Sequence, residues 1–422
     1  MIAEQFGFEG FKPSSAPRIV LAQNVSANDS GGDLQAMLKG SQGKAANTFS
    51  NLVRVLQTAP EFTGRFRLNL MTDTVELDGT MLSDAAVGKL RCDMEDMYGL
   101  RPGPESMYQA INTIVPAMSY HPVRSYLDGL VWDRVPRIER VPREVLGVAA
   151  KDCGPLVQRM LRCWFISAVA RAKDPGCKVD TVLVLVGPQG YYKSTFFHAL
   201  GAPWFLDTSI DLGNKDAFLQ LAKAWIYEWP EMEGITTERQ AGEVKAFLTS
   251  RCDSFRPPYG RAVIDHKRSS VIVGTTNEAK FLSDDTGSRR FWVVKVSNKV
   301  DLAQLREWRD QLWAEAVQAH AGGAAWWLDS LDEQAREEAA DEHVVIDPWE
   351  DLIANHVRGR SGVIKTDVIL EGPIQKSIGQ QTKGDARRVA GIMQRLGYKH
   401  VRENARKSDG ARTTSRGWAK AG

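Results

Sequence analysis

The chain has 422 residues, of which 43% are hydrophobic and 25% charged, with a formal net charge of +2. This is the composition of a soluble globular protein of two or three domains, and it excludes bulk disorder. The five scattered cysteines form no C-x-x-C pair, so they suggest neither a zinc site nor a redox motif and favour reduced thiols in a cytoplasmic protein. No signal peptide and no run of about 18 apolar residues is present, so we expect no membrane association.

Four regions follow one another along the chain. Residues 1–45 are rich in Ser, Gly, Asn and Pro, and we interpret them as a flexible tail. We assign residues 46–150 to an N-terminal collar region, mixed or helical, that serves oligomerisation, residues 151–345 to a P-loop domain and residues 346–422 to a basic domain. The patterns predict helices over 50–59, 83–99, 105–119 and 153–172, and a hairpin over 66–79 that turns at Thr72 and Asp73.

The stretch 181-TVLVLVG-187 is a run of β-branched residues and Leu, typical of a strand buried on both faces of a parallel sheet. A glycine-containing turn follows, and then a helix that begins at Lys193. Strand, glycine loop and helix in this order form a phosphate cradle, in which Lys193 would contact the β- and γ-phosphates and Ser194 would bind Mg²⁺. The predicted nucleotide-binding residues are Gly187, Pro188, Gln189, Gly190, Tyr191, Tyr192, Lys193, Ser194 and Thr195.

Tyr192 departs from the pattern G-x-x-x-x-G-K-[ST], which has glycine at this position. If the backbone there needs a positive φ, a side chain costs about 1–2 kcal/mol of strain. The strand, two glycines and the Lys-Ser pair are kept, so we still favour nucleotide binding. The alternative is an ordinary strand-turn-helix with an exposed lysine.

Polar residues end two further apolar strands. Glu228 ends the strand in 224-AWIYEWPEMEG-234, and Glu231 follows it; we predict that Glu228 binds the metal and Glu231 orients the attacking water. The strand in 269-SSVIVGTTNEAKFL-282 ends in two threonines and Asn277, which would bond to the γ-phosphate or the water. The alternatives are two solvated acids after a strand and an asparagine favoured by its turn.

Arg289 and Arg290 lie on a turn before another predicted strand. An arginine supplied to the γ-phosphate of a neighbouring subunit triggers hydrolysis in ring ATPases, and we expect one of this pair to do so, with a slight preference for Arg290. The alternative is a pair of surface arginines.

These segments together resemble the virulence-associated protein E family of phages and mobile islands, which are AAA+ ATPases close to superfamily 3 helicases. The resemblance rests on the loop, on 121-HPVRSYLDGLVWDRVPRIE-139, on 167-SAVARAKDPGCKVDTVLVLVGPQGYYKST-195, on 255-FRPPYGR-261 and on 275-TTNEAKFLSDDTGSRRFW-292. In this family the residue before the lysine varies, so the resemblance implies ATP binding despite Tyr192. It also implies helices around a parallel sheet, a hexameric ring with ATP at the subunit interfaces, and a role in replicating phage or island DNA. Some relatives carry a primase module ahead of this region; here only tail-like residues precede it, so we expect no primase activity.

Two basic segments are candidates for DNA contact. In superfamily 3 helicases, the region corresponding to 255–269 is a hairpin that grips single-stranded DNA, with basic groups on phosphates and aromatic rings on bases. The alternative is that Arg256 and Tyr259 are structural and help to dock neighbouring subunits. The candidate residues of this segment are Arg256, Tyr259, Arg261, His266, Lys267 and Arg268.

The second segment, from Lys376 to Lys420, has twelve Lys and Arg against three acids. A helix over 384–396 with an apolar stripe precedes a basic strand-like segment, which looks like a winged-helix module whose helix could enter the major groove of duplex DNA. Its predicted contacts are Arg387, Arg388 and Arg395. The alternative is a solvated basic helix face.

The sequence therefore predicts an α/β fold: an AAA+ P-loop ATPase core with a collar region and a small winged-helix-like domain. We expect an ATP- and Mg²⁺-dependent DNA translocase or helicase that replicates a phage or mobile element. The closest alternative is a non-unwinding initiator or helicase loader; the others are a small-molecule P-loop kinase and a DNA-binding regulator with an ATPase switch. Whether host replication proteins are recruited stays open.

Overall fold

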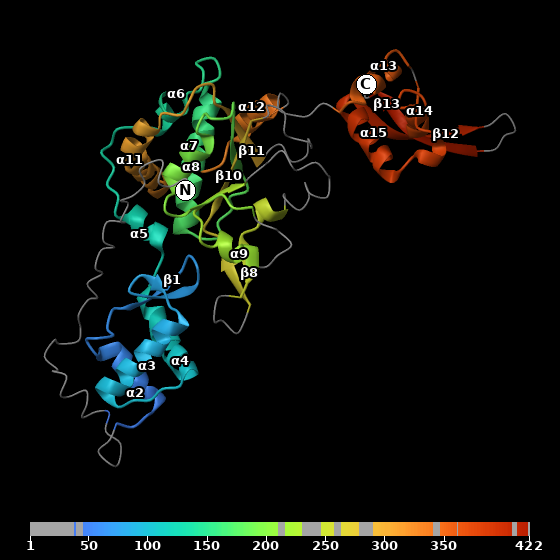
Figure 1. Cartoon of the computed structure of the whole chain (residues 1–422). Coiled ribbons are helices and arrows are strands. Elements are labelled where there is room, and N and C mark those ends of the chain that lie inside the picture. Colours follow the sequence, from blue (N-terminus) through green and yellow to red (C-terminus); the bar gives the residue numbers. More distant parts are fainter. Residues whose placement is uncertain are drawn as a thin grey trace. The chain divides into compact units, whose positions relative to one another are not determined.

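The structure is a computed structural model that describes residues 38, 45–209, 216–229, 246–256, 263–277, 290–340, 347–360, 362–406 and 412–420. The chain divides into two compact units, Met1–His343 and Val344–Gly422 (Figure 1). The predicted tail, 1–45, lies outside the described residues except for Leu38 and Ala45. Among the described helices, none is long and apolar enough to cross a membrane.

The N-terminal part of the first unit is a small mixed subdomain with its own hydrophobic core. Its sheet has the strand order β3-β2-β1-β4, and its core holds Leu56, Phe66 and Ile111. Ser83 caps the predicted second helix and Gly99 ends it in the left-handed conformation. The elements are α2 (Phe49–Thr58), β1 (Phe66–Asn69), β2 (Thr74–Leu77), β3 (Thr80–Met81), α3 (Asp84–Tyr98), α4 (Pro104–Ile114), η2 (Val115–Met118) and β4 (Ser119–Tyr120).

The larger part of the first unit contains a five-stranded sheet in which every neighbouring pair is parallel. Its order is β11-β5-β10-β7-β6, so β5 lies between two other strands, and all five of its residues are buried, as the Val and Leu run predicts. The strands are β5 (Val182–Val186), β6 (Phe205–Leu206), β7 (Ile226–Trp229), β10 (Val271–Thr276) and β11 (Phe291–Lys295).

Helices pack around this sheet through a cluster of aromatic rings. Trp313 of α11 lies 4.3 Å from Trp225 and 5.0 Å from Phe165 of α7, measured between ring centroids. Such rings bury large apolar areas, so this cluster fixes α7 and α11 on the sheet. The elements are α5 (Pro122–Asp128), η3 (Ile138–Arg140), α6 (Val141–Glu144), α7 (Pro155–Lys173), α8 (Lys193–Gly201), α9 (Asp216–Leu221), α11 (Leu302–Ala321) and α12 (Ser330–Ala340).

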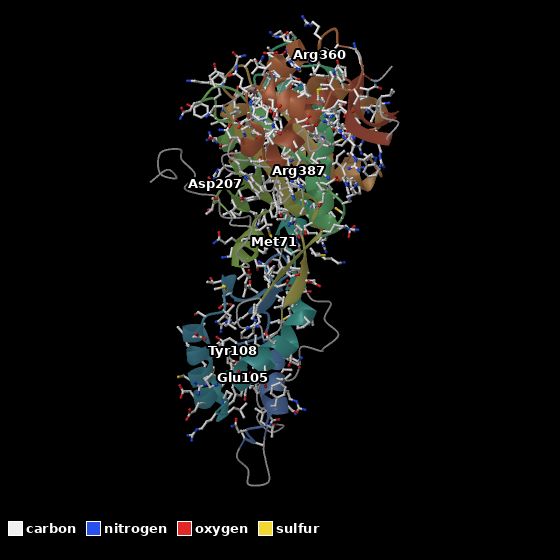
Figure 2. All side chains as sticks on the ribbon, turned by 90° about the vertical axis from the view of Figure 1, so that its right-hand side faces the viewer. Met71, Glu105, Tyr108, Asp207, Arg360 and Arg387 are labelled. Carbon is white, nitrogen blue, oxygen red and sulfur yellow. The ribbon has the colours of Figure 1, made fainter. Side chains whose placement is uncertain are left out.

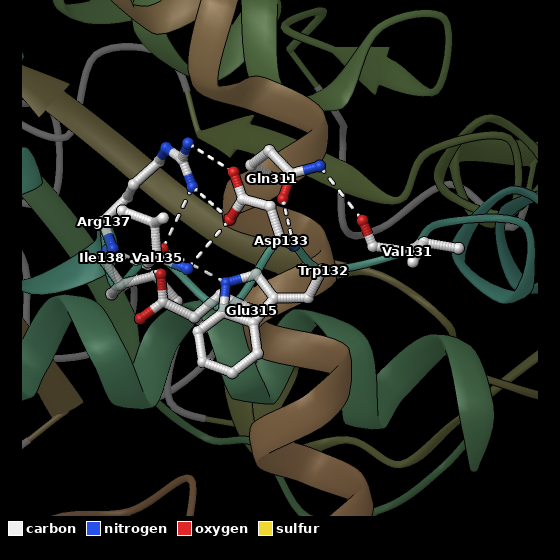
Figure 3. Close-up of polar contacts among 8 residues, drawn as sticks. All are labelled: Val131, Trp132, Asp133, Val135, Arg137, Ile138, Gln311 and Glu315. Carbon is white, nitrogen blue, oxygen red and sulfur yellow. Dashed lines mark hydrogen bonds and ion pairs between the residues drawn. The ribbon is translucent and has the colours of Figure 1, made fainter.

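The connection from α5 to η3 is held on α11 by side chains (Figure 3). The backbone N–H of Asp133 donates to Gln311 Oε1 at 2.9 Å, and that of Arg137 donates to Glu315 Oε2 at 2.6 Å. Burial raises the pKa of Glu315, and the hydrogen bonds that it accepts from the backbone N–H groups of Arg137 and Ile138 oppose that rise. The connection between α5 and η3 is therefore a loop that side chains of α11 hold in place.

The turn between β1 and β2 joins the N-terminal subdomain to the larger part of the unit. Met71, labelled in Figure 2, is 1% exposed and packs in the core of the larger part. Asp73 Oδ2 lies 2.5 Å from Nδ1 of His266, which belongs to the hairpin of β8 (Cys252–Phe255) and β9 (Ile264–Lys267). The subdomain therefore contacts this hairpin directly.

The second unit has a separate core that includes Ile353, Val389 and Trp418. The predicted apolar stripe of the basic helix forms part of this core, and a capping box of Thr382 and Asp385 begins that helix. The elements are α13 (Glu350–Val357), α14 (Thr366–Glu371), η7 (Ile378–Gln380), α15 (Lys383–Arg395), β12 (Tyr398–Arg406) and β13 (Arg412–Lys420), with a β-bridge from Ile364 to Trp418.

Candidate nucleotide-binding site

Residues 187–192 form a tight loop between β5 and α8. A Cβ at Gly187 would lie 2.4 Å from the carbonyl oxygen of Val296, so only glycine fits there. Gly190 has φ +80°, and Tyr192, the N-cap of α8, has φ 63° and ψ 29° in the left-handed region. The backbone therefore adopts the positive φ at which a tyrosine carries strain.

Lys193 lies over this loop and is only 7% exposed. Its Nζ donates to the carbonyl oxygens of Gly187 at 2.7 Å and Pro188 at 3.0 Å, and to Oδ1 of Asn277 at 2.9 Å. These bonds join the loop, its lysine and the end of β10. Lys193, the predicted contact of the β- and γ-phosphates, therefore lies beside Asn277, the predicted contact of the γ-phosphate or the water.

Glu228 accepts two hydroxyl hydrogen bonds on one carboxylate oxygen. Ser194 Oγ donates to its Oε1 at 2.8 Å, and Thr275 Oγ1 donates to the same Oε1 at 2.6 Å. The other oxygen, Oε2, is buried without a hydrogen-bond partner among the described residues. Burial raises the pKa of this carboxyl, and the bonds from Thr275 and Ser194 oppose that rise.

The donor set at this point fits Mg²⁺. A hydroxyl and a carboxylate supply the oxygen ligands that Mg²⁺ prefers, and the buried Oε2 of Glu228 needs a partner. The part of the chain that the structure describes holds no group of three or more His, Cys, Asp or Glu side chains that could bind a metal by themselves. Mg²⁺ usually takes one or two protein carboxylates together with waters and substrate phosphates, so Ser194 and Glu228 would suffice as its protein ligands.

A pocket of about 380 Å³ lies at this carboxyl edge of the sheet. It brings together six of the predicted nucleotide-binding residues and Asn277. It also includes Thr275 and Thr276, which the sequence places at the end of the same strand but which were not among the predicted site residues. The lining residues are Gln189, Gly190, Tyr192, Lys193, Ser194, Thr195, Thr275, Thr276 and Asn277.

The predicted water-orienting acid and the first predicted arginine, Glu231 and Arg289, lie outside the described residues. Arg290 directly precedes β11, whose first residue, Phe291, pairs with Val182 at the start of β5. The loop follows the other end of β5, about 16 Å away at the usual rise per residue. Arg290 therefore lies at the amino edge of the sheet and does not line the pocket of its own chain.

The structure corrects two of the predicted DNA contacts in the β8–β9 hairpin. Arg268 is 2% exposed, pairs through two nitrogens with Asp253 at 2.5 and 2.9 Å, and donates to the carbonyl oxygen of Phe247. His266 is buried against Asp73. Neither side chain reaches the surface where a phosphate would bind, so the prediction for both is wrong.

The other candidates of this segment divide into two groups. Arg256 and Lys267 are exposed, one at the end of β8 and one at the end of β9. Tyr259 and Arg261 lie outside the described residues. DNA contact by these four residues stays a prediction.

Two further predicted contacts, Arg388 and Arg395 of α15, are exposed and form ion pairs with acids of the same unit. Arg388 makes two 2.7 Å bonds to Asp347 and lies 3.9 Å above the ring of Trp349, and Arg395 bonds Glu350 at 2.7 Å. These pairs join the start of α13 to α15, and contact of the two exposed arginines with DNA stays a prediction. Arg387, labelled in Figure 2, is exposed, and its contact with DNA stays a prediction.

Comparison with known proteins gives one family and a group of distant structures. Three apo structures of the C-terminal region of NrS-1 each cover 88% of this chain and 99%, 98% and 98% of their own; their identities are 12%, 13% and 12% and their TM-scores 0.44, 0.44 and 0.45. None of the curated proteins compared with the chain matches it. The sequence model of the virulence-associated protein E-like domain matches residues 127–345. This match covers more than half of the chain, which therefore belongs to the virulence-associated protein E-like domain family.

Proposed function

We propose that this protein is an ATPase that binds Mg²⁺·ATP in the pocket at the carboxyl edge of the five-stranded sheet. The observation that carries the proposal is the convergence of Lys193, Ser194, Glu228 and Asn277 from three strand ends. Parallel sheets bind ligands at this edge, and the N-terminus of α8 adds backbone N–H groups that suit phosphate.

Each side chain has a distinct task in this proposal. Lys193 would neutralise the β- and γ-phosphates, whose oxygens would replace the loop carbonyls as acceptors of its hydrogen bonds. Ser194 and Glu228 would hold Mg²⁺, which would supply positive charge beside the phosphates. Asn277 orients the γ-phosphate or the attacking water, and Glu231 is our candidate for activating that water.

We further propose that the protein works as a ring of identical subunits, a hexamer, with ATP between neighbours. Arg290 lies at the opposite edge of the sheet from the pocket of its own chain. In this proposal Arg290 would therefore serve as an arginine finger for the ATP of a neighbouring copy. This geometry supports a ring rather than a monomer.

The substrate that we propose is DNA, and the role is translocation or unwinding during replication of a phage or mobile element. Membership of the family supports this role, together with exposed Arg256 and Lys267 at the ends of the hairpin strands. The second unit has the element order helix, β-bridge, helix, helix, hairpin, which suits a winged-helix DNA-binding module.

A second candidate function is a DNA-binding initiator or helicase loader that does not unwind. The observation that favours it is the internal pairing of Arg268, Arg388 and Arg395. These pairs leave fewer of the predicted cations to grip a moving strand.

Hydrolysis of ATP by the purified protein, with and without single-stranded DNA, tests the proposal. We expect stimulation by DNA, and a loss of at least about a hundredfold in Lys193→Ala. Lys89→Ala, an exposed lysine on α3, is the matched control and should hydrolyse ATP as the wild type does.

The other outcomes separate the candidates. Hydrolysis that ignores DNA would contradict the motor and favour the loader. Hydrolysis that survives in Lys193→Ala, or no binding of ATP by the wild type, would overturn the ATPase assignment itself.

A further inference from the structure

Thr275 lies where two neighbouring strands bring a hydroxyl onto a buried carboxylate. In the parallel register of β10 and β7, Val273 pairs with Glu228. Thr275 is two residues further along β10, so it points to the same face of the sheet as Val273 and sits diagonally from Glu228. The 2.6 Å bond from its Oγ1 to Glu228 Oε1 follows from this register.

The carboxylate depends on few donors. Glu228 is 3% exposed, and within the described part of the chain its Oε1 accepts hydrogen bonds from Ser194 and Thr275, whose own hydroxyls are 3.3 Å apart. A buried carboxylate that loses a donor is destabilised and free to turn.

The two hydroxyls differ in what Mg²⁺·ATP would require of them. In the proposed function, Ser194 Oγ would give a lone pair to Mg²⁺, so the position of this hydroxyl would be set by the metal as well as by Glu228. Thr275 has no such second task, and its bond can persist in both states.

From this difference we propose that Thr275 is a positioning residue: its hydroxyl keeps the Glu228 carboxylate oriented toward the Mg²⁺ site whether or not Ser194 holds the metal. The inference rests on the proposed function and adds to it a residue that lies outside the phosphate loop. Thr275 acts through Glu228 and does not touch the nucleotide phosphates in this role.

The test is the binding of a non-hydrolysable ATP analogue by calorimetry, once with Mg²⁺ and once with EDTA. In Thr275→Val, which keeps the shape and removes the hydroxyl, we expect affinity to fall about tenfold with Mg²⁺ and to stay unchanged with EDTA. The concentration of Mg²⁺ that half-saturates ATP hydrolysis should rise by a similar factor. Thr275→Ser should restore both, because it restores the hydroxyl.

Thr80→Val, an exposed threonine in β3, controls for the substitution itself, and Thr275→Ala is the second variant should Thr275→Val fail to fold. An equal loss of affinity with Mg²⁺ and with EDTA would overturn the inference, because Thr275 would then shape the nucleotide pocket rather than the metal site. So would unchanged affinity in both buffers, or a failure of Thr275→Ser to restore it. A wild type that binds no ATP would instead overturn the proposed function, which is a separate result.

Discussion

The backbone at Tyr192 has a conformation that most residues avoid. Its φ of 63° is imposed by the turn into α8, and its side chain is 37% exposed at the edge of the pocket. The ammonium of Lys299 lies 6.0 Å from the centroid of its ring, a contact worth about 0.5–1 kcal/mol at an exposed site. This contact offsets only part of the strain that a side chain carries there.

The strain at Tyr192 predicts an unusual order of stability among variants. Tyr192→Gly should be more stable than Tyr192→Ala by about 1 kcal/mol, because only glycine tolerates a positive φ while both variants lose the ring. At the neighbouring Tyr191, which is not among the positive-φ residues, the order should reverse, because glycine gains freedom in the unfolded chain. Urea denaturation of the four variants measures both differences, and the same order at both positions would contradict the strain.

At the scale of elements, the β8–β9 hairpin is anchored by a buried ion pair. Replacing Arg268 by Met removes the ion-pair partner of the buried Asp253 carboxylate, which should lower the free energy of unfolding by about 3–5 kcal/mol. Lys267→Met changes the exposed neighbour and should stay within about 0.5 kcal/mol of the wild type. The first thermal unfolding transition of the full chain compares the two variants. A stable Arg268→Met variant that has lost DNA binding would restore the original prediction for Arg268.

The local elements could be predicted from the sequence because their signals are local. The run that forms β5, the hairpin of β1 and β2, and the capped helix α3 each carry their pattern within a few residues. Lys193 and Ser194 could be predicted for the same reason, because they stand directly after the glycine-containing loop in the sequence.

Pairings between distant residues left no such pattern. Arg268 and Arg388 look like free cations in the sequence, since their partners, Asp253 and Asp347, lie 15 and 41 residues away. Thr275 meets Glu228 through a strand register that no single segment encodes. What sequence reasoning missed was therefore the neutralisation of charges by remote partners and the choice of partner across the sheet.

At the scale of the whole molecule, the two units have separate hydrophobic cores. The core of the second unit, with Ile353 and Trp418, is formed within residues 344–422. The candidate ATP site lies wholly in the first unit. Because neither core depends on the other, the two units should be separable in function.

Two variants with opposite defects test this separation. A chain that ends at His343 should keep ATP hydrolysis and lose most of its affinity for duplex DNA, because the basic second unit is gone. Full-length Lys193→Ala should do the reverse, losing hydrolysis and keeping the affinity. Fluorescence anisotropy with labelled duplex at several salt concentrations measures that affinity, and its salt dependence should be weaker in the truncated chain, which makes fewer phosphate contacts. If the truncated chain stays folded by circular dichroism yet no longer hydrolyses ATP, the second unit is needed at the site and the two units do not work independently.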